Sequence, residues 1–180
     1  MNNVAGIDYS ITCPSITLGN SKNFFDCKSF FLIDVKKYEG KFGNNIFGFK
    51  NEIYESQMER FDNTSEWAIT ILKKFKVNQV CIEGYSFASH AGRVFDLGEN
   101  GGILKHKLYK NNIEFIITPP SALKKSFTSK GNANKLVMYE AFLEKTNQYD
   151  LAALLNSKPD KNPVSDIVDS YAAMLYNYEL

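Results

Sequence analysis

The chain has 180 residues, of which 44% are hydrophobic. This balance permits a packed core, argues against a disordered protein, and fits one ordinary domain spanning residues 1–180. The formal net charge is only +1, so any contact with nucleic acid must come from a local cluster of Lys and Arg. No apolar run approaches the length of a membrane span, and the first residues show no signal peptide, so we expect a cytoplasmic protein with no membrane partner.

The cysteines and histidines indicate neither a disulfide framework nor a zinc site. The cysteines are odd in number, and no pair has the spacing of zinc ligands. Two histidines are too few for a His-rich metal site. We therefore expect buried free thiols in a reducing compartment. The cysteines are Cys13, Cys27 and Cys81, and the histidines are His90 and His106.

The first part of the chain predicts three strands joined by short turns. They fall at residues 3–10, 15–18 and 24–35, where apolar and β-branched residues lie between turn residues. The glycine-rich stretch 40–50 is expected to be an irregular loop or a weak edge strand. A helix follows and ends near Phe75, with apolar residues at helical spacing.

The second half predicts two further strands alternating with helices. Consecutive early strands followed by alternating elements predict an α/β fold, with a mixed five-stranded sheet (three antiparallel strands, then parallel strands) flanked by helices. We expect strands at 79–82 and 113–118, a loop at 84–102, and helices at 103–108, 132–146 and from Pro163 to about Tyr178.

Two carboxylates interrupt apolar strands. Asp8 follows the first apolar run, and Glu83 ends the run 79–82. A buried carboxylate is costly unless a cation or a hydrogen-bond donor satisfies it. The alternative is that each residue begins a turn and faces water, as most Asp and Glu residues do.

Two more carboxylates lie three residues apart on the last predicted helix. Asp166 and Asp169 therefore share one helix face, which can point toward the strand ends. A favourable interaction with the helix dipole explains Asp166 well and Asp169 less well. Clustered carboxylates without His or Cys suit Mg²⁺ or Mn²⁺, and two such ions can activate water and stabilise the leaving oxygen in phosphodiester cleavage.

The order of these motifs resembles the RuvC-type Holliday-junction resolvases of the ribonuclease H-like superfamily. The matching segments are Gly6-Ile7-Asp8, Val80-Cys81-Ile82-Glu83 and the run from Asp166 to Ala173. The resemblance spans nearly the whole chain, and the segment 84–108 is most similar to phage-encoded members. It implies a ribonuclease H-like fold, with Asp8, Glu83, Asp166 and Asp169 as catalytic metal ligands.

The resemblance also implies a homodimeric Mg²⁺-dependent endonuclease that resolves four-way and other branched DNA. Each subunit of a two-fold dimer would nick one strand of a junction that has near two-fold symmetry. The alternatives are another nuclease of the same fold, acting on RNA–DNA hybrids, flaps or branches, and an inactive junction-binding protein. An actin-like ATPase shares the early Asp but needs two such domains, for which 180 residues leave no room.

A basic segment precedes the last helix and is a candidate phosphate-binding surface. Its lysines have Ser and Thr residues between them, and phosphates are bound through such groups. Lys124 and Lys135 resemble the family's two DNA-facing lysines by position. The alternative is a solvated basic turn. The lysines concerned are Lys124, Lys125, Lys130 and Lys135.

Two aromatic residues follow Glu83 on a predicted loop. Tyr85 and Phe87 can stack on unpaired bases at a branch point, or simply pack beneath the loop. The family places its aromatic wedge at the position of Ser86, so the two aromatics flank that position. A further difference from the family lies directly after Asp8, where this chain has Tyr9-Ser10 and the family has Pro-Gly. Arg93 is a further candidate phosphate contact.

Overall fold

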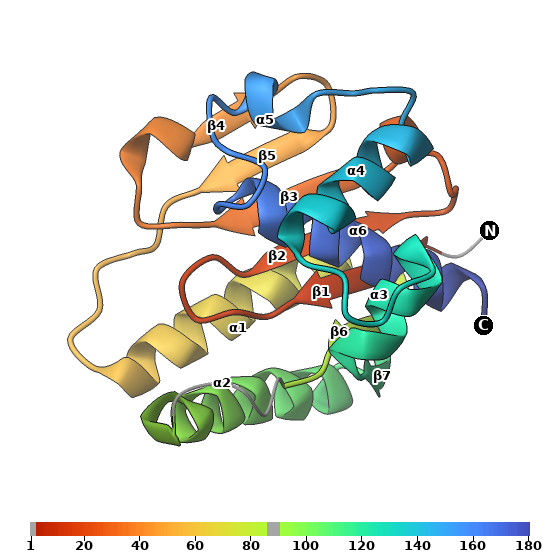
Figure 1. Ribbon diagram of the computed structural model, residues 1–180. Coiled ribbons are helices and arrows are strands. Elements are labelled where there is room, and N and C mark those ends of the chain that lie inside the picture. The colour runs from red at the N-terminus through yellow and green to blue at the C-terminus, as the bar shows by residue number, and fades with distance from the viewer. Residues whose placement is uncertain (1–2, 86–90) are drawn as a thin grey trace.

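The chain forms one seven-stranded sheet, in the order β4-β5-β3-β2-β1-β6-β7 (Figure 1). The computed structural model describes residues 3–85 and 91–180, without the side chains of 91–93. Strands β1, β2 and β3 pair antiparallel, whereas β6 runs parallel to β1 and β7 runs parallel to β6. The strands are β1 (Asn3–Asp8), β2 (Ser15–Gly19), β3 (Lys28–Leu32), β4 (Gly40–Phe42), β5 (Ile46–Phe49), β6 (Val77–Glu83) and β7 (Glu114–Thr118).

Helices cover both faces of this sheet. Helices α1 and α2 pack on one face around the buried side chains of Leu72 and Leu104, and α3, α4 and α6 pack on the other around Phe142 and Tyr171. No helix in the described part of the chain is both long and apolar enough to cross a bilayer. The α-helices are α1 (Gln57–Lys74), α2 (Ala91–Lys110), α3 (Pro120–Thr128), α4 (Lys135–Lys145), α5 (Leu151–Leu154) and α6 (Val164–Tyr178), and two 3₁₀ turns lie at Phe24–Asp26 and Lys36–Tyr38.

The predicted α/β class and strand directions are confirmed, but the predicted number of strands was too low. The glycine-rich stretch 40–50 forms the antiparallel pair β4–β5, and β5 adds to the edge strand β3 in parallel. The position of β5 requires glycine at residue 48, because a Cβ atom there would overlap the Tyr38 carbonyl oxygen. The third strand is shorter than predicted, since its first residues form a 3₁₀ turn capped by Asn23.

Three helical segments also differ from the prediction. The stretch 84–102, predicted to be a loop, is helical from Ala91, because α2 packs Leu104 and Leu108 against the sheet and tertiary packing outweighs the low helix propensity of its glycines. Helix α3 was not predicted; it begins at Pro120, which suits the first turn of a helix. Helix α4 begins at Lys135, three residues later than predicted, because Asn134 caps it.

Helix α6 lies unusually close to β1 because β1 contains Gly6. A Cβ atom at Gly6 would overlap the backbone of Ser170 and Met174, so any other residue there would push the helix away. At the far end of the helix, Asn177 Nδ2 donates to the carbonyl oxygens of Ala5 and Gln79 at 3.2 and 3.1 Å. These contacts fix the helix against both central strands.

Buried hydroxyl groups set the rotation of α6 about its axis. Ser170 Oγ is hydrogen-bonded to Ser15 Oγ at 3.0 Å and to Thr17 Oγ1 at 2.8 Å, and Thr17 is in turn hydrogen-bonded to Ser29 at 2.9 Å. Because all four residues are completely buried, these bonds satisfy groups that water cannot reach. Asp169, the neighbour of Ser170, is thereby held at the carboxyl ends of β1 and β6.

Candidate active site

Three carboxylates from three elements meet at one edge of the sheet. Asp8 and Glu83 are the last residues of the parallel strands β1 and β6, which pair up to Ile7 and Ile82, so their side chains leave the sheet at the same edge. Asp169 joins them from α6. One carboxylate oxygen from each of the three lies within 4.8 Å of the others. The predicted convergence of these three residues is therefore present in the structure.

Asp166 lies one helical turn before Asp169 and is more buried. Its side chain is hydrogen-bonded to Asp8, and Ser165 Oγ lies 3.4 Å from Asp166 Oδ2. The residue is 5% exposed and is not one of the three carboxylates with mutually close oxygens. The structure therefore brings all four predicted carboxylates together, with Asp166 bonded to the cluster through Asp8.

Burial and mutual repulsion make the strand-end carboxylates hard to ionise. Burial is the largest cause that raises the pKa of Asp8, and the charges of Asp166, Glu83 and Asp169 raise that pKa further. Burial, together with the charge of Asp169, raises the pKa of Glu83 to about 8, although Lys124 opposes this shift. Such shifts are typical of carboxylates whose compensating charge is a bound cation.

The pKa values of the two helix carboxylates are raised less than that of Glu83. Burial raises the pKa of Asp166 to about 6 against the opposing charge of Lys135. Burial and the charge of Asp166 raise the pKa of Asp169 to about 6, while Lys135 and Lys124 act in the opposite direction. The site is therefore an acidic cluster bordered by two lysines.

The chemistry of this cluster fits a hard divalent cation. All of its close oxygen donors are carboxylates, the ligands that Mg²⁺ and Mn²⁺ prefer. A cation would also remove the repulsion that raises these pKa values. Asp8, Glu83 and Asp169 are positioned to hold it.

The three free cysteines are buried, as expected. Cys13 lies beside Asp166 and Asp8, and burial raises the pKa of its thiol.

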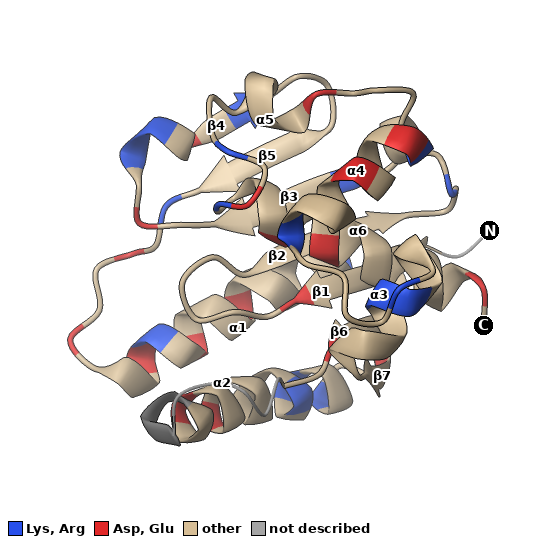
Figure 2. Ribbon diagram, in the orientation of Figure 1, with Lys and Arg blue, Asp and Glu red and all other residues tan. Residues whose placement is uncertain are grey.

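The carboxylates lie in a cavity of about 420 Å³ that two of the predicted lysines also line. Lys124 comes from α3 and Lys135 from the start of α4, where its Nζ donates to Ser165 Oγ at 3.0 Å. Figure 2 shows the acidic end of β1 beside acidic positions of α6, with basic positions on α3 and at the start of α4. Lys125 and Lys130 are exposed and do not line the cavity, so their contact with DNA stays a prediction.

Of the aromatic and arginine candidates, only Tyr85 can be placed beside the carboxylates. It lines the same cavity and is 41% exposed. Phe87 lies outside the described residues, and so does the Arg93 side chain, although the Arg93 backbone belongs to α2. The proposed roles of both residues therefore stay predictions.

Several residues that line the cavity were missed in the sequence. Lys105 and Gly101 come from α2, and Thr12 and Asn162 come from loops next to β1 and α6. The Asn162–Pro163 peptide bond is cis, and Asn162 Nδ2 lies 3.4 Å from Thr12 Oγ1. The four-residue spacing of Gly101 and Lys105 could have placed both on one helix face. The glycines before them instead favoured a loop prediction.

Comparison with known proteins places the chain in a defined family. Residues 47–171 match the family model described as "Crossover junction endodeoxyribonuclease RuvC". A curated protein of that same description, from Brachyspira hyodysenteriae (strain ATCC 49526 / WA1), is 30% identical over 125 residues, covering 68% of this chain and 76% of the relative.

Solved structures share the fold at low sequence identity. RuvC of Thermus thermophilus, in complex with a Holliday junction substrate, has a TM-score of 0.65 and 14% identity, and covers 99% of this chain and 95% of that one. The yeast mitochondrial Holliday junction resolvase has a TM-score of 0.60 and 18% identity, and covers 99% of this chain and 79% of that one. These similarities confirm the predicted ribonuclease H-like architecture.

Proposed function

The chain belongs to the RuvC family of crossover junction endodeoxyribonucleases, and from that premise we propose that it hydrolyses phosphodiester bonds at four-way DNA junctions. The observation that carries this proposal is the convergence of Asp8, Glu83 and Asp169, whose carboxylate oxygens lie within 4.8 Å of one another at the sheet edge. A junction-binding protein without activity has no need of such a costly cluster.

The residues of the cavity divide into two roles. Asp8, Glu83 and Asp169 hold the divalent cation, with Asp166 bonded to Asp8 behind them. The bound metal supplies an activated water and charge stabilisation for the leaving oxygen. Lys124 and Lys135 line the same cavity and bind the phosphate whose bond is cut.

We propose Mg²⁺ as the cation, with Mn²⁺ as a substitute and two ions in each site. A set of four carboxylates carries enough negative charge for two divalent ions, and none of its donors is a soft ligand that would favour zinc or copper. We also propose that the protein acts in the cytoplasm, as expected from the sequence.

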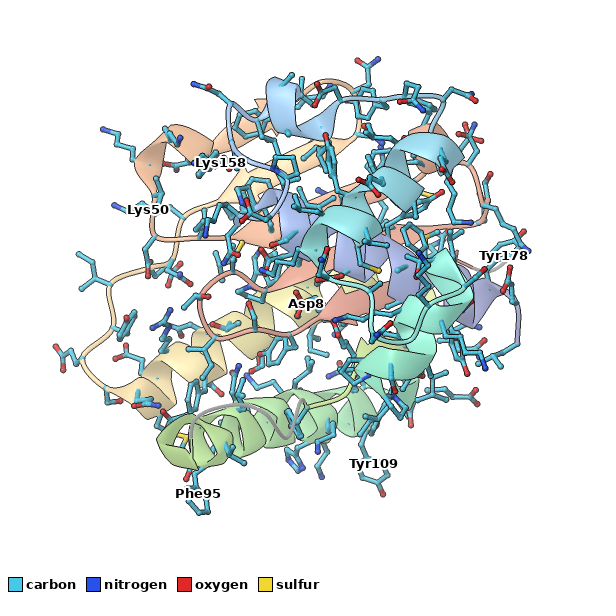
Figure 3. The ribbon with its side chains drawn as sticks, in the orientation of Figure 1. Asp8, Lys50, Phe95, Tyr109, Lys158 and Tyr178 are labelled. Atoms are coloured by element: carbon cyan, nitrogen blue, oxygen red, sulfur yellow. The ribbon has the colours of Figure 1, made fainter. Side chains whose placement is uncertain are left out.

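Two-fold symmetry makes a homodimer the natural partner of a four-way junction. Helix α2 offers a surface for it: Phe95 and Tyr109 are 76% and 73% exposed and project away from the sheet (Figure 3). Gly98 and Gly102 lie between them on the same helix face, and no described atom lies within 4 Å of a Cβ built at either. This stripe lets a second copy of α2 approach closely.

A substrate panel tests the proposed activity. The protein is incubated with labelled four-way junction, linear duplex, flap and RNA–DNA hybrid, each with Mg²⁺ and with EDTA. We expect paired nicks in the junction with Mg²⁺ alone, and little cleavage of the duplex or the hybrid. Preferred cleavage of the hybrid would instead indicate a ribonuclease H activity.

A further inference from the structure

Tyr85 leaves the sheet from a rigidly held position. Gly84 N donates to Thr118 O at 2.8 Å, which keeps the chain paired to β7 for one residue beyond Glu83. The Tyr85 side chain then turns toward α2 and lines the cavity that contains the carboxylates. Its place beside Glu83 is thus fixed by the backbone.

Helix α2 has a gap in which the Tyr85 hydroxyl lies. A Cβ atom at Gly101 would overlap the Tyr85 hydroxyl oxygen and would lie 3.0 Å from its Cζ atom. Any side chain at Gly101 would therefore displace the ring. Gly98, on the same helix, has no described atom within 4 Å of its Cβ position, so glycine is not needed there for packing.

Lys105 lies one helical turn after Gly101 and covers the same ring. Its Nζ atom lies 5.7 Å from the centre of the Tyr85 ring, within the range of a cation–π interaction. Lys105 forms no ion pair among the described residues, and residues 86–90 contain no carboxylate that could neutralise it. By contrast, Lys107 is paired with Asp62 and Glu66.

From these contacts we infer that Tyr85, Gly101 and Lys105 form a nucleotide-binding subsite beside the metal site. The base next to the scissile phosphate stacks on the open part of the Tyr85 ring, and Lys105 binds the neighbouring phosphate. Gly101 is a positioning residue, because it leaves the space in which the ring is held. This inference rests on the proposed function and adds to it the residues of α2.

The chemistry of the cavity wall supports this assignment. Leu97 and Leu104 of α2 line the same cavity and add apolar surface to it. An aromatic platform with an unpaired cation suits a base and its phosphate, since bases stack on aromatic rings regardless of sequence. A ring held by Gly101 and Lys105 is a fixed platform on which a base can stack. A different residue would then insert between the bases at the branch point.

The variant Gly101→Ala tests the subsite with little change elsewhere. The added methyl group should displace only the Tyr85 side chain, while alanine favours the helix. The variant Thr70→Ala is the control, because it likewise favours a helix but lies at an exposed position of α1, outside both the cavity and the α2 stripe. Tyr85→Leu removes the aromatic ring and keeps an apolar side chain.

The first readout is the fluorescence of 2-aminopurine placed at either nucleotide that flanks the cleaved bond, measured in EDTA so that no cleavage occurs. At one of these positions, wild type and Thr70→Ala should quench the signal, whereas Gly101→Ala and Tyr85→Leu should not. The second readout is single-turnover cleavage of a junction that is abasic at that position. Loss of the base should slow wild type roughly 5- to 150-fold, the range expected for base stacking, and should slow Gly101→Ala little further.

Equal quenching by all four proteins, together with equal abasic effects, would overturn the subsite while leaving the nuclease intact. Failure of the wild type to cut any junction would overturn the proposed function, and the subsite with it. Lys105→Ala should weaken junction binding in EDTA, and unchanged affinity would remove Lys105 from the subsite.

Discussion

Lys135 Nζ donates a hydrogen bond to Ser165 Oγ at 3.0 Å and so ties α4 to the residue that precedes Asp166. Ser165 is 4% exposed and also lies 3.4 Å from Asp166 Oδ2. One buried hydroxyl therefore contacts both a cation and a carboxylate that line the cavity.

Ser165→Ala should lower the single-turnover cleavage rate roughly tenfold, because a hydrogen bond to a charged group is lost and Lys135 is freed. Ser165→Thr keeps the hydroxyl group and should restore most of the rate. The readout is junction cleavage at saturating protein, with thermal unfolding as the check of stability. Equal rates for the alanine and threonine variants would show that the hydroxyl group positions nothing.

Lys124→Ala and Lys135→Ala should each weaken junction binding and make its salt dependence shallower. One phosphate contact contributes a slope of about 0.9 in log affinity against log salt. The matched control is Lys73→Ala, since Lys73 is exposed on α1 at the other face of the sheet. If the cavity lysines gave the same slope as the control, they would be solvated residues without a phosphate contact.

The metal-free protein should become less stable as the pH rises from about 4 to about 8. The pKa values of Asp166 and Asp169 are raised to about 6 and that of Glu83 to about 8, so the unfolded chain loses its protons first. These groups therefore do not lower the free energy of unfolding at low pH, where they are protonated in both states, and they lower it most at high pH. Mg²⁺ should raise the melting temperature more at pH 8 than at pH 5.

Thermal melts with and without Mg²⁺ at both pH values measure this linkage. Asp169→Asn is the control, because it removes one repelling charge and should raise the melting temperature of the metal-free protein at pH 8. An Mg²⁺ effect that did not change with pH would show that the carboxylates do not bind the ion.

The variant Phe95→Asp should dissociate the proposed dimer, because it replaces the most exposed aromatic side chain of the α2 stripe with a charge. Ile53→Asp makes the same change at a residue that is 97% exposed in the segment before α1. Sedimentation equilibrium should show a dimer for wild type and Ile53→Asp, and a monomer for Phe95→Asp. A wild-type monomer at every concentration would contradict the dimer.

The sequence was sufficient to predict the acidic cluster because each carboxylate interrupts an apolar element. Asp8 and Glu83 could be placed at strand ends from the apolar runs before them, and the spacing of Asp166 and Asp169 put both on one helix face. The close approach of α6, which brings these groups together, depends on Gly6 and the buried hydroxyl groups. That contact is tertiary, and no local pattern contains it.

Two of the parts that were not predicted, the strand pair β4–β5 and the first half of α2, share a high content of glycine. Gly48 allows the extra pair β4–β5, and Gly101 belongs to a helix that composition alone indicates as a loop. In both places glycine makes room for a neighbouring group, and local propensity does not report such packing. Lys105 lies within the helix predicted at 103–108, but no local pattern showed that this helix lines the cavity.

The central claim is that Asp8, Glu83 and Asp169 hold the metal that cuts a DNA junction. The most direct measurement is single-turnover cleavage of a labelled four-way junction with Mg²⁺ by wild type and by Asp169→Asn, with junction affinity measured for both in EDTA. We predict nicked product from the wild type, none from the variant, and equal or tighter binding by the variant, because a negative charge near phosphate is removed. Near-normal cleavage by a stably folded Asp169→Asn protein, or robust cleavage by the wild type in EDTA, would contradict the claim.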